Sequence, residues 1–152
     1  MSERLDHLIG YFETITEATV QKLRDCYAAD ASFKDPFNEV HKVEQIEQIF
    51  AHMFGPLSEP RFIVHTRIEQ GDEAFLTWDF RFRIKKYKSD VEQVIRGGSH
   101  LCFDPQNKVC YHRDYWDAAE ALYEKLPLIG GLMPIRETPN GLALHAGPSC
   151  RI

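Results

Sequence analysis

Hydrophobic residues at the start of the chain recur three and four positions apart, the spacing of one face of an α-helix. The positions that follow this pattern are Leu5, Leu8, Ile9 and Phe12. They predict an amphipathic helix of about residues 5–12 with one buried stripe. Thr14 and Glu17 have the T-x-x-E spacing of a capping box, so a second helix is expected to begin there. Its buried residues should be Val20, Leu23 and Tyr27.

A third helical pattern covers about residues 43–54 and stops at Gly55-Pro56, a strong helix terminator. Between the second and third helices lies the segment ASFKDPF. It predicts a short extended piece, because Pro36 pushes Asp35 out of helical geometry.

Beyond residue 60 the sequence becomes rich in β-branched and aromatic residues, which predicts four strands joined mostly by short turns. A last helix of about residues 118–125 should begin after Asp117. Three helices, a run of antiparallel strands and a terminal helix predict an α+β fold. The sheet must curl around the helices to bury both sets of apolar faces. A doubly wound sheet is excluded, because strands and helices do not alternate.

The turn that begins at Asp104-Pro105 predicts the register of the last two strands. It would place Ser99 opposite His112, so that both share one face with Asp114. His100 would then lie on the other face. No H-x-H or H-E-x-x-H pattern occurs either, so we expect no metal site, and no motif for any other cofactor is present.

Gly71-Asp72 suits a two-residue turn that would pair Val64 with Asp79. Asp79 and Arg81 would then share a face with Val64, and Trp78 would lie on the opposite face. Both faces of this sheet contain large apolar groups, which one layer of helices cannot cover. We therefore expect a homodimer that forms through the sheet.

The length of 152 residues suits one domain, which we assign to residues 1–126. The remaining segment, residues 127–152, contains four of the eight prolines and four of the nine glycines. It should be mostly irregular and is expected to act as a lid or a dimer contact.

The formal net charge of −5 argues against a nucleic-acid partner, because no global positive field attracts phosphate groups. The first ten residues lack the continuous apolar stretch of a secretion signal, and no run approaches the length of a membrane span. The four cysteines form no C-x-x-C pair. A cytoplasmic protein without a membrane partner is the preferred interpretation.

The order of elements, the string YAADASFKDPF and the ending KVCYHRDYWD resemble the nuclear transport factor 2-like superfamily. Ketosteroid isomerase, the SnoaL-like polyketide cyclases and limonene epoxide hydrolase share its cone-shaped fold. The similarity covers about residues 5–125. It implies helices packed in the concavity of a curved, mostly antiparallel sheet. It is a poor guide to chemistry, because this fold hosts many functions, including non-catalytic binding.

Resemblance to the isomerase implies three catalytic residues. The general-base aspartate of the D-P dipeptide corresponds to Asp35, and the oxyanion-binding tyrosine of the first helix corresponds to Tyr11, sixteen residues before Tyr27. The second oxyanion donor, a protonated aspartate in the isomerase, corresponds to Ser99. A hydroxyl donates a hydrogen bond less strongly than that acid does.

Resemblance to the epoxide hydrolase points to Asp114, within Arg113-Asp114-Tyr115-Trp116-Asp117, as a water-activating residue. The Arg-x-Asp pair of the hydrolase is reversed here, as Asp79-Phe80-Arg81. A cluster of Asp79, Arg81 and Asp114 is expected to orient a ligand oxygen or a water molecule.

These features predict a small-molecule enzyme that moves a proton in a conical pocket, as an isomerase or a cyclase, with Asp35 or Asp114 as the acid–base group. Its substrate should be apolar and oxygen-bearing. The expected substrate-binding residues are Phe33, Phe37, Phe54, Asp79, Arg81, His112 and Trp116. Two alternatives stay open. One is a binding or dimerisation module without catalysis, and the other is water activation of the epoxide-hydrolase type.

Overall fold

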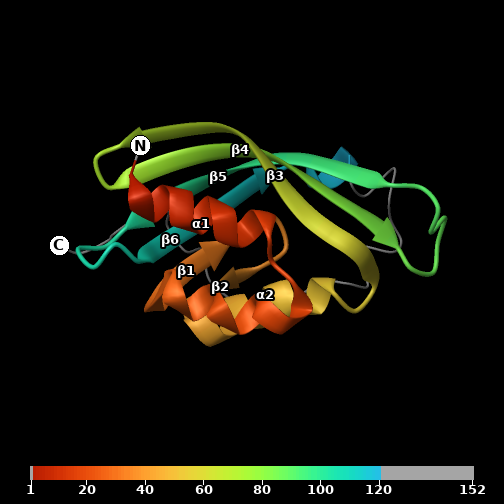
Figure 1. The fold of residues 1–152 in the computed structure, drawn as a ribbon, viewed down its shortest axis with the longest axis horizontal. Helices are drawn as coiled ribbons and strands as arrows, with labels where there is room; N and C mark the ends of the chain where they lie inside the picture. Colours follow the sequence, from red (N-terminus) through yellow and green to blue (C-terminus); the bar gives the residue numbers. More distant parts are fainter. Residues whose placement is uncertain (1, 121–152) are drawn as a thin grey trace.

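Helix α1, Glu3–Glu13, forms as its apolar spacing predicts and lies inside the curve of the sheet (Figure 1). The structure is a computed structural model, and it describes residues 2–120. The predicted stripe of α1 is buried, since its four apolar residues are at most 8% exposed. Tyr11, on the flank of this stripe, donates hydrogen bonds to the carbonyl oxygens of Thr19 and Val20 and so joins α1 to the next helix.

The second helix is a 3₁₀ helix, η1, that spans Glu17–Asp25. A capping box is present, but it pairs Thr16 with Thr19 and not Thr14 with Glu17 as predicted. Tyr27 was expected in this helix and belongs to a strand instead. The apolar spacing could not distinguish the two assignments of Tyr27. Val20, Leu23 and Tyr27 are all buried, although the helix ends at Asp25 and Tyr27 begins the strand.

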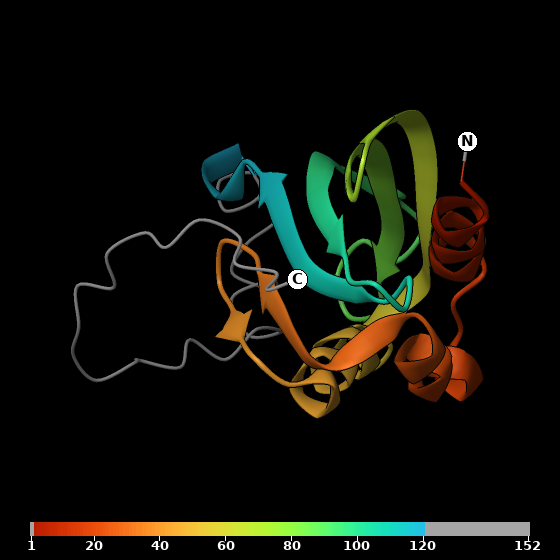
Figure 2. The same cartoon turned by 90° about the vertical axis from the view of Figure 1, so that its left-hand side faces the viewer.

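Helix α2, Val43–Met53, ends where Gly55-Pro56 predicts, and it buries Val43, Ile46 and Phe50. This helix and η1 pack against one another beside the first strand. Together the three helices fill the concave side of the sheet (Figures 1 and 2).

The sheet has six strands in the order β2-β1-β6-β5-β4-β3. Their bounds are β1 Tyr27–Lys34, β2 Glu39–Val40, β3 Leu57–Gln70, β4 Glu73–Ile84, β5 Gln93–Phe103 and β6 Val109–Trp116. The four predicted strands are confirmed, and the extended piece at ASFKDPF supplies β1. All neighbouring strands are antiparallel except β1 and β6. The predicted α+β fold with a curved, mostly antiparallel sheet is therefore confirmed.

Strands β5 and β6 pair two residues away from the predicted register. Ser99 lies opposite Asp114, and Leu101 lies opposite His112. One residue of this shift is already present at the turn, where Phe103 pairs with Val109 and not with Lys108, and the β-bulge between Cys102 and Phe103 adds the second. A shift of two residues keeps every side chain on its predicted face. Ser99, His112 and Asp114 therefore share the inner face, which faces the helices.

A β-bulge at His65 changes the faces of β3. Thr66 pairs with Thr77 as predicted, but beyond the bulge Val64 pairs with Trp78 and not with Asp79. Since paired residues share a face, Val64 and Trp78 both point inward, and Asp79 points to the outer face of the sheet. The predicted grouping of Val64 with Asp79 is wrong for this reason.

Gly97 and Gly98 continue β5 without a bulge. They provide space for large side chains on the two faces of the sheet. A Cβ atom on Gly97 would lie 2.5 Å from the ring of Trp78, and one on Gly98 would lie 2.9 Å from the ring of Phe75. Glycine at 97 therefore allows the Trp78 indole to lie flat against the inner face.

The predicted last helix begins as expected, because Asp117 Oδ1 accepts hydrogen bonds from the amides of Ala119 and Glu120. The rest of that helix and the segment 127–152 lie outside the described residues, so the lid or dimer contact stays a prediction. Within residues 2–120, no helix combines the length and the apolar character needed to cross a membrane.

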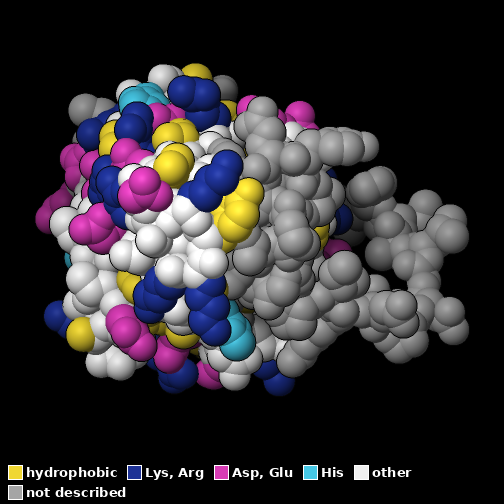
Figure 3. Space-filling model, turned by 90° about the vertical axis from the view of Figure 1, so that its right-hand side faces the viewer, with side chains coloured by type: hydrophobic (Ala, Val, Ile, Leu, Met, Phe, Trp, Pro, Cys, Tyr) yellow, Lys and Arg dark blue, Asp and Glu magenta, His cyan; other side chains and the backbone are white. Residues whose placement is uncertain are grey.

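Basic side chains near the open end of the β3–β4 hairpin are paired with acidic ones. Arg61 and Arg81 both contact Glu92, and Arg83 lies 3.4 Å from Glu59. Figure 3 shows this side of the molecule, where dark-blue and magenta side chains lie next to one another over the described part. The basic run at the end of β4 is therefore interspersed with opposite charge.

Candidate functional site

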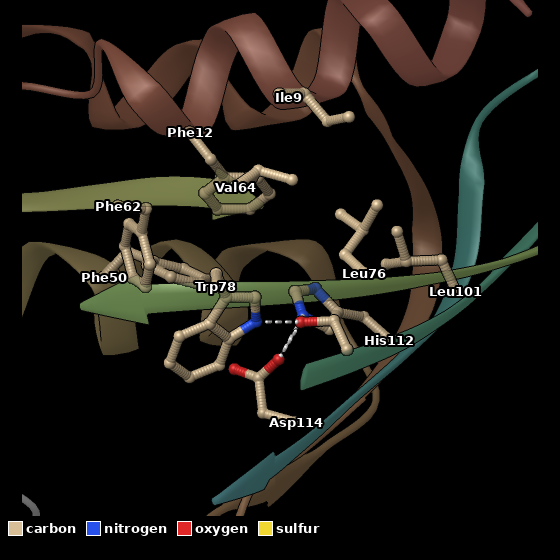
Figure 4. Close-up of a pocket in the computed structure, with 11 residues that line it drawn as sticks. Ile9, Phe12, Phe50, Phe62, Val64, Leu76, Trp78, Leu101, His112 and Asp114 are labelled. Carbon is tan, nitrogen blue, oxygen red and sulfur yellow. Dashed lines mark hydrogen bonds and ion pairs between the residues drawn. The ribbon is translucent and has the colours of Figure 1, made fainter. Parts of the chain in front are cut away.

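Two cavities lie between the helices and the inner face of the sheet. They share the walls formed by Phe50, Phe62, Trp78 and Asp114. The larger cavity has a volume of about 90 Å³ and the smaller one about 30 Å³. Figure 4 shows the smaller cavity, with side chains of α1 above and Asp114 rising from β6 below. The lining is mainly aromatic and aliphatic, so a charged group there has few polar neighbours.

Asp114 is the centre of a hydrogen-bonded network on the inner face. Its Oδ1 atom accepts a hydrogen bond from Ser99 Oγ at 2.5 Å and lies 2.7 Å from His112 Nε2. Ser99 Oγ in turn accepts a hydrogen bond from Trp78 Nε1 at 2.8 Å. The hydroxyl of Tyr27 lies 2.6 Å from His112 Nδ1. Five side chains from four strands are thus linked in one chain.

The proton positions in this network follow from Tyr27. Burial raises the pKa of Tyr27 well above its usual value, and the nearby charge of Asp114 raises it further. The phenol therefore keeps its proton. Nδ1 of His112 is the one hydrogen-bond partner of this hydroxyl among the described residues, so we assign the hydroxyl as the donor and Nδ1 as the acceptor. A neutral imidazole that accepts at Nδ1 carries its proton on Nε2, and it donates that proton to Asp114. His112 is accordingly assigned as the neutral Nε2–H tautomer.

The two oxygens of Asp114 have different environments. Oδ1 receives the hydrogen bonds of Ser99 and His112, whereas no described residue donates to Oδ2. The Asp114 side chain is 12% exposed and lines both cavities. In Figure 4 the second oxygen points away from the dashed bonds. A carboxylate held by one oxygen and open at the other can accept a proton from a bound molecule.

Asp35 lines the larger cavity and is 7% exposed, but its carboxyl organises a turn. Oδ1 accepts hydrogen bonds from the backbone amides of Phe37 and Asn38 at 2.8 and 2.6 Å, and Asn38 Nδ2 contacts both oxygens. Burial raises the pKa of Asp35, and these hydrogen bonds offset part of that rise. The predicted base therefore lies at the cavity with both oxygens engaged.

Tyr11 is not among the residues that line the two cavities. Its hydroxyl is 3.0 Å from the carbonyl oxygen of Val20, and burial raises its pKa. The structure thus places Tyr11 as a link between two helices. The oxyanion role that the resemblance implied for it has no support from this geometry.

Asp79 and Arg81 lie on the outer face, across the sheet from Asp114. Asp79 is paired there with Arg81 at 3.2 Å, with His65 at 3.3 Å and with Arg96 at 3.8 Å. The predicted cluster of Asp79, Arg81 and Asp114 is therefore not assembled. The register of β4 with β5 and the alternation of side chains along β4 explain the separation, because Trp78 and not Asp79 pairs with the inward-facing Gly97.

The predicted aromatic residues are only partly at the site. Phe33 and Trp116 line the larger cavity, and Phe37 packs edge-on against Trp116 with ring centroids 5.3 Å apart. Phe54 caps the C-terminus of α2 and is not among the lining residues. His112 lies among aromatic rings, with Phe33 4.9 Å away.

Two residues of the network were missed by the sequence analysis. Tyr27 was assigned to a helix, although it lies only four residues before the start of the extended ASFKDPF segment, which could have placed it on a strand. Trp78 was correctly placed on the face opposite Asp79, but it was not grouped with Val64, because the bulge in β3 leaves no clear signal in the sequence. Phe50 and Phe62 were not among the predicted site residues, and both form walls shared by the two cavities.

The described lining of the larger cavity contains no Lys or Arg that could pair with the phosphate groups of a nucleotide cofactor. Its titratable groups are Asp35, His52 and Asp114. Such a set can transfer protons and can bind small molecules with an apolar body. Side chains of the kind that ligate metals meet elsewhere, on the outer face, at Glu73, His100 and Cys102.

The fold and the sequence both have relatives. The sequence matches the family model of the SnoaL-like domain over residues 8–112. A comparison with curated proteins gives no significant match.

Among solved structures, a protein of ketosteroid isomerase-like fold from Catenulispora acidiphila DSM 44928, in complex with trimethylamine, is similar with a TM-score of 0.67 and 14% identity. That similarity covers 81% of this chain and 92% of the other. A candidate SnoaL-like polyketide cyclase from Jannaschia sp. CCS1 has a TM-score of 0.66 and 11% identity, over 78% and 88% of the two chains.

A nuclear transport factor 2-like protein of unknown function from Burkholderia pseudomallei K96243 has a TM-score of 0.69 and 14% identity. The similarity covers 81% of this chain and 97% of that one. At these identities the structures establish the fold alone, whereas the family model matches well over half of the sequence. The chain therefore belongs to the SnoaL-like domain family of the nuclear transport factor 2-like superfamily.

Proposed function

We propose that this protein is a small-molecule enzyme in which Asp114 moves a proton within an apolar interior. The observation that carries the proposal is the asymmetry of the Asp114 carboxylate. Ser99 and His112 hold Oδ1, no described residue donates to Oδ2, and Asp114 lines both cavities. The SnoaL-like family and the polyketide cyclase assigned in one structural relative support a substrate with a carbonyl group.

In the proposed reaction, Asp114 Oδ2 takes a proton from the carbon next to a substrate carbonyl, and the electron pair of that C–H bond forms an enolate. In an isomerase, the same proton returns to a different carbon. In a cyclase, the enolate carbon attacks a second carbonyl of the substrate, and the resulting alkoxide takes the proton from Asp114. Either sequence restores the carboxylate, so no external reactant is required.

The developing enolate oxygen requires a hydrogen-bond donor. His52, near the end of α2, lines the larger cavity and is exposed. We assign it as the donor to this oxygen, because the N–H of Trp78 is already bonded to Ser99. In this proposal His52 takes the oxyanion-binding role that the resemblance implied for Tyr11. Ser99 does not bind the oxyanion and instead donates a hydrogen bond to Asp114.

The test is proton exchange at carbon. The purified protein is incubated in D₂O with a panel of small ketones, β-keto esters and 1,3-diketones, and the loss of each α-proton is followed by NMR. At least one compound should exchange faster than in buffer. Asp114→Asn should lower that rate by about 10²–10⁴-fold, the usual contribution of a general base. His52→Ala should lower it by about tenfold or more.

Asp30→Asn is the matched control, because Asp30 is an exposed carboxylate on β1 and lies on no cavity wall. Its exchange rate should equal that of the wild type. Unchanged exchange in Asp114→Asn would disprove the assigned role. Saturable binding of the panel compounds without exchange would favour the alternative of a binding module.

One observation favours that second candidate. The cavities of about 90 and 30 Å³ are smaller than the roughly 300–1,000 Å³ of typical ligand sites. A module that binds a small compound without turnover fits this volume. The epoxide-hydrolase alternative is not proposed, because Asp79 and Arg81 lie across the sheet from Asp114.

We also propose that a second copy of the chain covers the outer face. Ile68, Phe75 and Tyr115 are 60%, 38% and 45% exposed on this face, where they line one shallow hollow. A contiguous apolar surface of this kind favours self-association. Native mass spectrometry should give a dimer mass for the wild type and a monomer mass for Phe75→Glu. A monomeric wild type would contradict this proposal.

A further inference from the structure

Three side chains of metal-ligating type meet on the outer face of the sheet. They are Glu73, His100 and Cys102, and one ligand atom of each lies within 4.8 Å of the others. His100 Nε2 is 2.9 Å from Glu73 Oε2 and 3.9 Å from Cys102 Sγ. The set combines a carboxylate oxygen, an imidazole nitrogen and a sulfur.

The sheet itself brings these groups together. His100 and Cys102 are two residues apart on β5, so both side chains point to the outer face. Glu73 begins β4 directly opposite Cys102. Glu73 is therefore a diagonal neighbour of His100, and its side chain is long enough to reach the imidazole. Rigid, paired strands therefore hold all three ligands, and none of them depends on a loop.

The two separations measured from His100 are close to those of a tetrahedral ion. With Zn–S bonds near 2.3 Å and Zn–N or Zn–O bonds near 2.0–2.1 Å, ligand atoms in a tetrahedral zinc site are about 3.4 Å apart. The two separations from His100, 2.9 and 3.9 Å, lie on either side of that value. Rotation of the Glu73 side chain, which is 60% exposed, can adjust the first.

In the single chain, the site opens into the same hollow that the proposed second copy would cover, so an ion would reach it in the monomer. His100 and Glu73 line an open hollow, and Gln70 lies at the same hollow. The Cys102 residue is 4% exposed, so an ion would reach its sulfur from the side of the other two ligands. Three protein ligands leave a fourth position for water or for the amide oxygen of Gln70.

We propose that Glu73, His100 and Cys102 form a binding site for one zinc-like divalent ion, on the opposite side of the sheet from Asp114. No metal site was expected from the sequence, because H-x-H and H-E-x-x-H patterns are absent. That expectation did not consider the H-x-C pattern of His100 and Cys102, and Glu73 comes close to these two residues only through the register of β4 and β5. Nitrogen and sulfur ligands favour zinc or cobalt over magnesium or calcium.

The test is titration of the full chain with Zn²⁺ by calorimetry and with Co²⁺ by absorption spectroscopy. The wild type should bind one ion per chain, and the cobalt form should show a thiolate-to-cobalt charge-transfer band. Cys102→Ser should abolish that band. His100→Gln and Glu73→Gln should each weaken zinc binding about tenfold or more. Both of these residues are partly exposed, so their variants should keep the fold.

His65→Gln is the matched control, because His65 is another exposed histidine paired with a carboxylate on the same face, at Asp79, and no cysteine lies in that cluster. Its zinc affinity should equal that of the wild type. The proposal is overturned if the wild type binds no zinc at micromolar concentrations. It is also overturned if His65→Gln weakens binding as much as His100→Gln does.

Discussion

The hydroxyl of Tyr27 lies 2.6 Å from Nδ1 of His112, in the buried interior between β1 and β6. The two rings stack with centroids 6.0 Å apart, and both residues are at most 4% exposed. This contact fixes which nitrogen of His112 faces Asp114. Tyr27 thus acts on the proposed base through the histidine, as a positioning residue.

Tyr27→Phe tests that role. Removal of the hydroxyl leaves His112 Nδ1 without its donor in a buried site, which should lower the free energy of unfolding by about 1–3 kcal/mol. The Nε2–H tautomer of His112 should also lose its preference. ¹⁵N NMR of the imidazole should show a mixture of tautomers or a charged ring in the variant, and one tautomer in the wild type.

A loss of stability alone would not identify a positioning role, so the tautomer is the decisive measurement. Tyr87→Phe serves as the control, because Tyr87 is 44% exposed and outside the network. It should change neither the tautomer nor the stability measurably. An unchanged Nε2–H signal in Tyr27→Phe would show that Asp114 alone sets the tautomer.

Most of the elements could be predicted from local patterns. The apolar stripe of α1, the stop at Gly55-Pro56 and the β-rich second half each depend on residues close in sequence. The face of Ser99 and Asp114 was also predicted correctly, because the error in register was an even number of residues. A side chain changes face only when the shift is odd.

The candidate site was harder to predict, since single-residue bulges decide it. The bulge at His65 shifts β3 by one residue and moves Val64 to the face of Trp78. Asp79 is separated from Asp114 by the pairing across β5, because Leu76 and not Asp79 shares the face of Ser99 and Asp114. Bulges depend on packing between strands, and the sequence of β3 alone carries no glycine to mark this one.

Asp35 should make the stability depend on pH. Burial raises its pKa in the folded protein, so the folded state binds the proton more tightly than the unfolded state does. The free energy of unfolding should therefore decrease as the pH rises from about 4, the ordinary value of an aspartate, through the raised pKa. Asp35→Asn lacks this group, and its stability should change less over the same range.

Urea denaturation of both proteins between about pH 4 and pH 7 measures this difference. Asp30→Asn, an exposed carboxylate on the same strand, should retain the pH dependence of the wild type. Parallel curves for Asp35→Asn and the wild type would show that Asp35 titrates alike in the folded and unfolded states.

Asp79 should have the opposite pH dependence and no part in proton transfer. Burial acts to raise its pKa, but hydrogen bonds from His65 and Arg81 outweigh this effect and lower it. Its stabilising contribution is present above the ordinary pKa of an aspartate and is lost as the pH falls through the lowered value. Asp79→Asn should lower stability at neutral pH by about 1–2 kcal/mol, and less in acid.

The deuterium exchange rate of Asp79→Asn should equal that of the wild type, because Asp79 lies on the outer face. Equal exchange together with reduced stability would show that Asp79 has a structural role, distinct from the proton-transfer role of Asp114. A large loss of exchange, with the fold intact, would instead place Asp79 in the reaction.

Gly97 should tolerate no side chain, since an added Cβ would lie 2.5 Å from Trp78 Cη2 and 2.8 Å from the Tyr115 carbonyl oxygen. Gly97→Ala should therefore displace the indole, cost about 1–3 kcal/mol of stability and weaken the bond from Trp78 to Ser99. Gly10→Ala is the matched control, because no atom lies within 4 Å of its added Cβ and helix α1 should gain up to about 1 kcal/mol. Tryptophan fluorescence during denaturation reads both effects. A Gly97→Ala protein with wild-type fluorescence and stability would mean that the strand shifts to make room, and that the Trp78–Ser99–Asp114 geometry does not require glycine.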